Sequence, residues 1–145
     1  MIDQTDLAIL KALSNDSRIK IKALSKEVAL SEPSVKTRIE KMIDNGIITS
    51  FSIEIDYSKL GYTIPLYIQI SDLTITNRHF LKIVEQLPEI TAISSVTGET
   101  NYLLKAQVQT VKDMETLLSI LIQYGKVATS IVLEEKNAGK LIDTL

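Results

Sequence analysis

The chain has 145 residues, of which 45% are hydrophobic and 23% are charged, and its formal net charge at pH 7 is -2. This composition is that of a folded protein and excludes a disordered chain, while the length allows one ordinary domain or two small ones. The absence of cysteine excludes disulfides, thiolate catalysis and cysteine-based metal sites. Because the N-terminal stretch holds neither a long apolar run nor a basic leader, we expect no signal peptide, no membrane span and a cytoplasmic location.

A first helix is predicted over residues 3–13. Leu7, Leu10 and Leu13 recur at spacings of three, which places them on one side of a helix. Asp3 lies near the N-terminal end, where a negative charge interacts favourably with the helix dipole. We expect this helix to pack across the next two and to complete a three-helix core.

Residues 18–48 contain two further apolar-periodic segments with a break at residues 29–30. This pattern predicts two short helices joined by a tight turn, which is a helix-turn-helix. Ser31 is a good N-cap for the second helix, Pro33 suits its first turn, and residues 44–46 supply its end. The apolar positions are Ile21, Leu24 and Val28 in the first segment and Val35, Ile39, Met42 and Ile43 in the second.

The face of the second helix opposite its apolar stripe is free to meet a partner. Between Arg18 and Lys41 there are seven basic and three acidic residues, which gives this stretch a net charge of about +4. A basic patch on a helix that fits the major groove predicts duplex DNA binding, and a solvated amphipathic helical pair is the alternative. The residues expected to meet base edges or phosphates are Ser34, Thr37, Arg38 and Lys41, and those expected to hold the DNA backbone are Lys36, Lys22 and Lys26.

The hydrophobic period changes to two between residues 47 and 56, which predicts a half-buried strand linking two domains. Beyond it the elements follow the order β-α-β-β-α-β, which is the ferredoxin-like arrangement. The expected fold class is therefore α+β, with an N-terminal three-helix winged-type helix-turn-helix domain followed by a ferredoxin-like βαββαβ domain. The expected domains are residues 1–48 and 62–145, joined by a linking strand and turn at 49–61. Within the second domain we expect two helices, four strands and a short helical piece after residue 137. The helices are predicted at 77–87 and 112–124, and the strands at 64–71, 90–97, 102–109 and 127–134.

One face of the predicted sheet should be covered by its two helices, and the other should pack against a second copy of the chain. The second face is too apolar to be comfortable in water, although an open, water-facing sheet is the alternative. A dimer would present two recognition helices to a palindromic operator. The helix-covered positions are Ile64, Leu66, Ile68, Ile70, Tyr102, Leu104, Ala106 and Val108, and the open-face positions are Tyr67, Gln69, Leu103, Lys105, Ser130 and Val132.

Four short motifs follow one another along the N-terminal half of the chain. Arg18-Ile19 precedes the second helix, Ser31 to Val35 starts the third, Arg38 lies in its middle, and Gly46-Ile47-Ile48 follows its end. This set resembles that of the Lrp/AsnC (feast/famine) transcription regulators, which implies a sequence-specific DNA-binding regulator. Ala29 departs from the pattern, because the family usually has Gly at this turn and Ala adopts a left-handed conformation only at a steric cost.

The segment from Val96 to Leu104 resembles the part of Lrp/AsnC proteins that joins two strands of their effector-binding and oligomerisation domain and carries a Gly-x-x-Asp-Tyr pattern. In many members that domain binds an amino acid between dimers. Asn101 stands where the family has Asp, and an amide lacks the full charge that anchors an α-ammonium group. Either Glu99 substitutes, or the site takes a different ligand or none. The expected effector-binding residues are Gly98, Glu99, Thr100, Asn101 and Tyr102, with Thr129 and Ser130 as weaker candidates.

The sequence gives no indication of catalysis. His79, the only histidine, has no partner at a telling spacing, so it is interpreted as a surface or capping residue. No phosphate loop, paired-carboxylate motif or zinc spacing is present, so no cofactor or metal is expected. Two alternatives to a regulator remain: an architectural protein that coats DNA without an effector, and an enzyme similar to the sirohaem decarboxylases, which share a similar two-domain layout.

Overall fold

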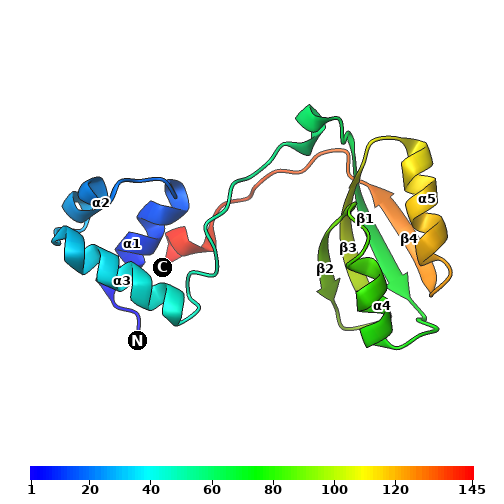
Figure 1. Ribbon diagram of the computed structural model, residues 1–145, viewed down its shortest axis with the longest axis horizontal. Helices are drawn as coiled ribbons and strands as arrows, with labels where there is room; N and C mark the ends of the chain where they lie inside the picture. The colour runs from blue at the N-terminus through cyan, green and yellow to red at the C-terminus, as the bar shows by residue number, and fades with distance from the viewer. The chain divides into compact units, whose positions relative to one another are not determined.

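The computed structural model describes residues 1–145 and divides into two compact units (Figure 1). The first unit comprises Met1–Glu54 together with Asn137–Leu145, and the second comprises Ile55–Lys136. None of the helices is both long enough and apolar enough to span a membrane.

The first unit is a three-helix bundle. Its helices are α1 (Gln4–Asn15), α2 (Ile21–Glu27) and α3 (Glu32–Asp44). The predicted apolar stripes converge on one core, because each helix of this length buries only one side and needs the others to cover it. The buried core residues are Ile9, Leu24, Val35, Ile39 and Met42.

The start of α3 and the turn before it agree with the sequence prediction. The Ser31 side chain accepts a hydrogen bond from the amide of Ser34 at 3.3 Å, so Ser31 is the N-cap. Ala29 has a φ of 52°, which is the left-handed conformation that the departure from the family's glycine suggested. The turn between α2 and α3 is therefore formed at the cost of backbone strain at Ala29.

The strand predicted at residues 47–56 is absent, so that prediction was wrong for the single chain. Residues 49–56 are extended but have no hydrogen-bonded neighbour, and they are exposed. The side chains of Phe51 and Ile53 are 51% and 78% exposed. Alternating hydrophobicity reports that a segment suits a sheet, whereas a strand also requires a partner for its backbone groups.

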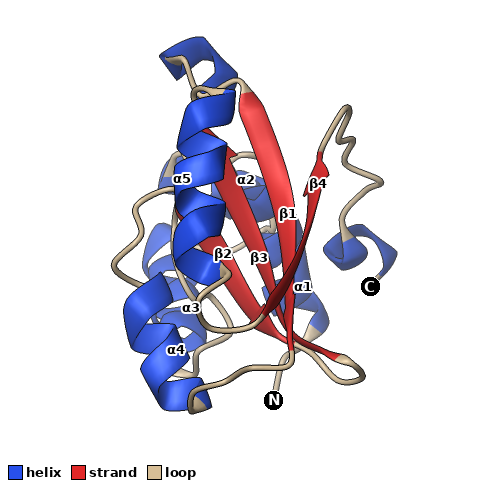
Figure 2. Cartoon of the chain, turned by 90° about the vertical axis from the view of Figure 1, so that its right-hand side faces the viewer, coloured by secondary structure: helices blue, strands red, loops and turns tan.

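The second unit has the predicted ferredoxin-like architecture. Its sheet is antiparallel with the strand order β2-β3-β1-β4, and the two helices cover one face of it (Figure 2). The side chains of Phe80, Val84, Leu117 and Leu121 from these helices join the predicted inward positions of β1 and β3 in a single core. The elements are η1 (Tyr57–Leu60), β1 (Ile64–Ser71), α4 (Asn77–Val84), β2 (Ile90–Ser95), β3 (Thr100–Val108), α5 (Val111–Leu121) and β4 (Lys126–Ile131).

The C-terminal tail differs from its expected place. Residues 137–145 were assigned to the second domain, but they pack with the first unit and include the short helix η2 (Leu141–Thr144). The Lys140 ammonium group donates to the carbonyl of Ser14 and, at 3.1 Å, to the side chain of Asn15. The ammonium group thus satisfies the carbonyl of Ser14, which lies at the end of α1 and has no partner within the helix.

We predict that Ala29→Gly stabilises the protein. Relief of the left-handed strain exceeds the extra unfolded-state entropy of glycine, so the free energy of unfolding should rise by about 0.5 to 1 kcal/mol. Urea denaturation measures this change. Gly46→Ala is the matched control, because Gly46 has a φ of 69° with nothing within 4 Å of an added Cβ, and it should lower stability through the backbone alone. Equal stability of Ala29→Gly and the parent would show that the turn is not strained.

Candidate functional site

The polar face of α3 is accessible, as the sequence predicted for DNA contact. Ser34, Lys36, Thr37 and Lys41 are all exposed, and so are Lys22 and Lys26 on α2. With 3.6 residues per turn, Ser34, Thr37 and Lys41 share one side of α3, while Lys36 lies on the other flank. Three of the four predicted α3 contacts to base edges or phosphates are therefore free and adjacent.

The hydroxyl groups on this face are partly committed within the helix. Thr37 donates to the carbonyl of Pro33 at 3.0 Å, and the hydroxyls of Ser34 and Ser31 lie 2.8 Å apart. Each hydroxyl oxygen can still accept a hydrogen bond from a base or a water. Lys41 takes part in no ion pair, so it is the free cation of this face.

Arg38, unlike the other residues predicted to contact DNA, forms ion pairs within its own chain. Its Nη1 atom donates to Oδ2 of Asp3 and to Oδ1 of Asp6, each at 2.7 Å. The Arg38 side chain is 32% exposed, and that of Asp6 is 11% exposed. We call this three-residue cluster the Arg38 clasp; it ties the middle of α3 to the first turn of α1.

The clasp is electrostatically favourable. The pKa of Asp3 is lowered first by the hydrogen bond from the Asp6 amide and then by the Arg38 guanidinium, and the pKa of Arg38 is raised by the two carboxylates. Asp3 also caps α1 in a capping box with Asp6. In the structure Arg38 pairs with two carboxylates of its own chain, whereas the sequence predicted that it would meet base edges or phosphates. Two aspartates three residues apart at the start of a helix were the available signal.

The hairpin predicted to bind an effector joins β2 to β3. Gly98 has a φ of 103°, a conformation that favours glycine. Oδ1 of Asn101 is buried and has no hydrogen-bond partner, which is costly unless a ligand or another chain supplies a donor. Tyr102, by contrast, is 3% exposed and its ring lies 5.1 Å from that of Phe80, so it is a core residue rather than a ligand contact. Glu99 is exposed and makes no ion pair.

Thr100 belongs to the hairpin, whereas the two remaining predicted effector residues, Thr129 and Ser130, do not. Thr100 lies opposite Ser71 at the start of β3. Thr129 and Ser130 lie opposite Ile68 and Tyr67, several residues farther along β1. Because successive side chains of a strand point to opposite faces, Thr129 and Ser130 also face different sides of the sheet. Thr129 and Ser130 therefore do not point to the same side, and the register places both away from the hairpin.

The open face of the sheet carries an ion pair that sequence reasoning missed. Lys105 Nζ lies 2.8 Å from Oε1 of Glu135, and the Tyr67 hydroxyl donates to the same oxygen at 3.0 Å. The pKa of Glu135 is lowered by Lys105 and then by Tyr67. Glu135 follows the last strand without any periodic signal, so only the fold reveals that it returns to this face.

Known protein families match the sequence of each of the two units. A family described as winged helix-turn-helix DNA-binding matches residues 2–49, and one described as Lrp/AsnC ligand binding domain matches residues 72–141. The transcriptional regulator LrpA of Bacillus subtilis is 33% identical over 134 residues, which cover 92% of this chain and 98% of that protein. LrpC of B. subtilis is 27% identical, covering 92% and 93%.

Solved structures share the whole fold. The structure of B. subtilis LrpC has a TM-score of 0.90 at 26% identity, covering 96% of this chain and 99% of that one. Escherichia coli AsnC has a TM-score of 0.86 at 28% identity, covering 98% and 99%. A Neisseria meningitidis regulator, solved as a complex with L-Met, has a TM-score of 0.86 at 24% identity, covering 94% and 93%.

A helix-turn-helix unit with an exposed polar face on its third helix, joined to a ligand-binding βαββαβ unit, defines a DNA-binding transcriptional regulator that responds to small-molecule ligands. The relatives carry the same two units over nearly their whole length. The chain belongs to the Lrp/AsnC family of transcriptional regulators.

We predict that the clasp makes the first unit sensitive to acid. Because the pKa of Asp3 is lowered in the folded chain, its contribution to stability is complete above its ordinary value of 3.8 and is lost as the pH falls through the lowered value. Asp3→Asn should therefore flatten the loss of stability between about pH 5 and pH 1, as followed by urea midpoints. Asp44→Asn, at an aspartate outside any ion pair, is the control. A parent-like pH profile for Asp3→Asn would contradict the role of the clasp.

Proposed function

We propose that this chain is a cytoplasmic, sequence-specific transcriptional regulator, not an enzyme, whose α3 helix enters the major groove. The observation that carries the proposal is the exposed side of α3 formed by Ser34, Thr37 and Lys41. Hydroxyls and an ammonium group are able to reach base edges and phosphates there. Lys36, Lys22 and Lys26 contact the DNA backbone on either side, since they lie exposed on the flank of α3 and on α2.

Arg38 has a positioning role in this proposal. The Nη1 atom of Arg38 is held by two carboxylates at 2.7 Å, and a base contact by that nitrogen would require their release and would leave Asp3 and Asp6 unpaired beside the phosphates. The clasp instead fixes the direction in which α3 presents its exposed side. The consequence is that changes to Arg38 act on all DNA sequences alike.

We predict a graded response to lysine substitution. Lys41→Ala should cost about 1 to 3 kcal/mol on the preferred operator and relax the preference at one base position, because an ammonium group reads guanine acceptors. Lys22→Ala should weaken every sequence about equally and reduce the slope of log K against log salt by about one, because it removes one phosphate contact. Fluorescence anisotropy with an operator selected from a random library, and with its single-base variants, measures both effects.

Arg38→Ala and Asp6→Asn complete this series. Each should weaken binding to all operator variants by the same factor, because each breaks the clasp without removing a base contact. A shift in preference at a single position for Arg38→Ala, without a matching change for Asp6→Asn, would show that Arg38 reads a base. Parent-like binding by all four variants would overturn the assignment of α3 as the reading helix. Footprints covering whole fragments, rather than spaced half-sites, would support a coating protein instead.

We propose that the β2–β3 hairpin binds an amino acid and that the open sheet face pairs with a second copy. The unpaired Oδ1 of Asn101 supports the proposed ligand site, because this buried oxygen needs a hydrogen-bond donor such as an α-ammonium group. The carboxylate of Glu99, in the same hairpin, supplies negative charge. The mixed polar and apolar character of Tyr67, Leu103 and Lys105 supports the dimer, which gives two α3 helices for a palindromic operator.

We predict that calorimetry against the 20 amino acids finds a ligand whose binding depends on Asn101. Methionine is one natural first choice, because the N. meningitidis protein of this fold forms a complex with L-Met. Asn101→Asp should tighten binding of a ligand that presents its ammonium group to this position, whereas Asn101→Leu should abolish it. Thr116→Val, on the exposed side of α5 and outside both the hairpin and the other cavities, is the control. Binding unchanged by both Asn101 variants would place the effector elsewhere.

A further inference from the structure

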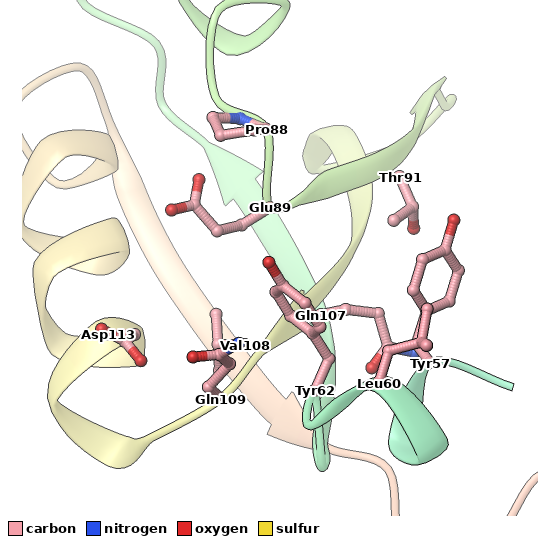
Figure 3. A pocket seen from close by; sticks show the side chains of 10 residues that line it. All are labelled: Tyr57, Leu60, Tyr62, Pro88, Glu89, Thr91, Gln107, Val108, Gln109 and Asp113. Carbon is pink, nitrogen blue, oxygen red and sulfur yellow. The ribbon is translucent and has the colours of Figure 1, made fainter.

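A separate cavity of about 330 Å³ opens at the other end of the same sheet (Figure 3). It lies between η1, the segment that precedes β2, and the junction of β3 with α5. Gly98 precedes the first residue of β3, whereas Gln107 and Val108, which line the cavity, end that strand. At about 3.4 Å per residue the two places are roughly 27 Å apart, so this cavity is distinct from the effector hairpin.

The cavity walls are held by hydrogen bonds of the fold. The amide of Gln107 donates to the carbonyl of Glu89 at 2.9 Å, which fixes the segment before β2 against the end of β3. The amide of Tyr62 donates to the carbonyl of Tyr57 at 3.0 Å and closes η1. Gly61, next to Tyr62, would place an added Cβ 3.8 Å from the Gln109 side chain, so η1 approaches this edge closely. The walls therefore exist before any ligand binds.

The charge of the lining is of one sign. Among the 10 lining residues are two carboxylates, Glu89 and Asp113, and no lysine, arginine or histidine. Neither takes part in an ion pair. Oδ2 of Asp113 accepts from the amide and hydroxyl of Thr110, which leaves its other oxygen free, and Glu89 is half-buried with no side-chain hydrogen bond. A half-buried, unpaired carboxylate favours a cationic partner.

Aromatic and apolar groups share the cavity with these carboxylates. The rings of Tyr57 and Tyr62 meet edge to face with centroids 6.4 Å apart, and Figure 3 shows the Tyr62 ring pointing toward Glu89. Tyrosine faces attract an ammonium or guanidinium group, and Leu60 and Val108 offer surface for an alkyl chain. The volume is within the range of small-molecule sites.

From this geometry we propose that the cavity is a second ligand site, for a small aliphatic amine held as a cation between Glu89 and the tyrosine rings. A diamine fits the chemistry, because Asp113 has one carboxylate oxygen free to accept from a second ammonium group. The bound amine links η1, the first element after the connecting segment 49–56, to β2 and β3. The inference is independent of DNA binding.

The test is titration of the isotope-labelled full chain with butane-1,4-diamine, followed by amide chemical shifts. Saturable shifts should map to Tyr57, Thr91 and Gln107 and leave Gly98 unchanged. The neutral butane-1,4-diol, of the same length, should produce none. Glu89→Gln, which keeps the shape and removes the charge, should weaken binding at least about tenfold. Glu99→Gln is the matched control in the hairpin and should bind like the parent.

Tyr57→Leu provides a second variant that leaves both carboxylates in place, and it should also weaken the diamine. Absence of saturable shifts, equal shifts with the diol, or parent-like affinity in Glu89→Gln would each overturn the proposal. Equal shifts with calcium chloride would also overturn it, because they would reveal a simple cation site in which the rings play no part. A change in oligomeric mass in Glu89→Gln, with no response to diamine in the parent, would show that a side chain of a second copy occupies the cavity instead.

Discussion

The Arg38 guanidinium group ties α3 to the start of α1 in the first unit. Arg38 joins α3 to two carboxylates at the start of α1, one of which also caps that helix. Charge-assisted hydrogen bonds are directional, so the clasp adds to the apolar core in fixing the rotation of α3 about its own axis. That rotation decides which side chains of α3 face outward, and Ser34, Thr37 and Lys41 are among them.

The strand β3 plays the corresponding role in the second unit. It lies in the interior of the sheet between β1 and β2, and its inward side chains Leu104 and Ala106 are fully buried. Its first residues follow the hairpin with the unpaired Asn101 oxygen, and its last residues line the acidic cavity. Because this strand is buried in the core, the hairpin at one end and the cavity at the other are supported by the same rigid element.

Basic and acidic side chains are distributed unevenly along the chain. The chain as a whole is slightly acidic, whereas residues 18–41 carry a local excess of basic side chains. DNA binding therefore depends on a local field, which salt screens, rather than on general attraction to the polyanion. Unpaired carboxylates such as Glu89 lie in the second unit, where they favour a cationic partner.

The sequence by itself predicted the order of helices and strands in the two units, apart from the strand expected at residues 47–56, because apolar period and N-caps such as Ser31 are properties of neighbouring residues. Only the tertiary structure decided the partner of Arg38, the place of residues 137–145 and the lack of a strand partner for residues 49–56. It also decided that Glu89 lines a cavity with Tyr62. Periodicity reports that a side chain is buried or exposed, but an ion pair, a ladder or a pocket depends on which distant groups the fold brings within contact distance.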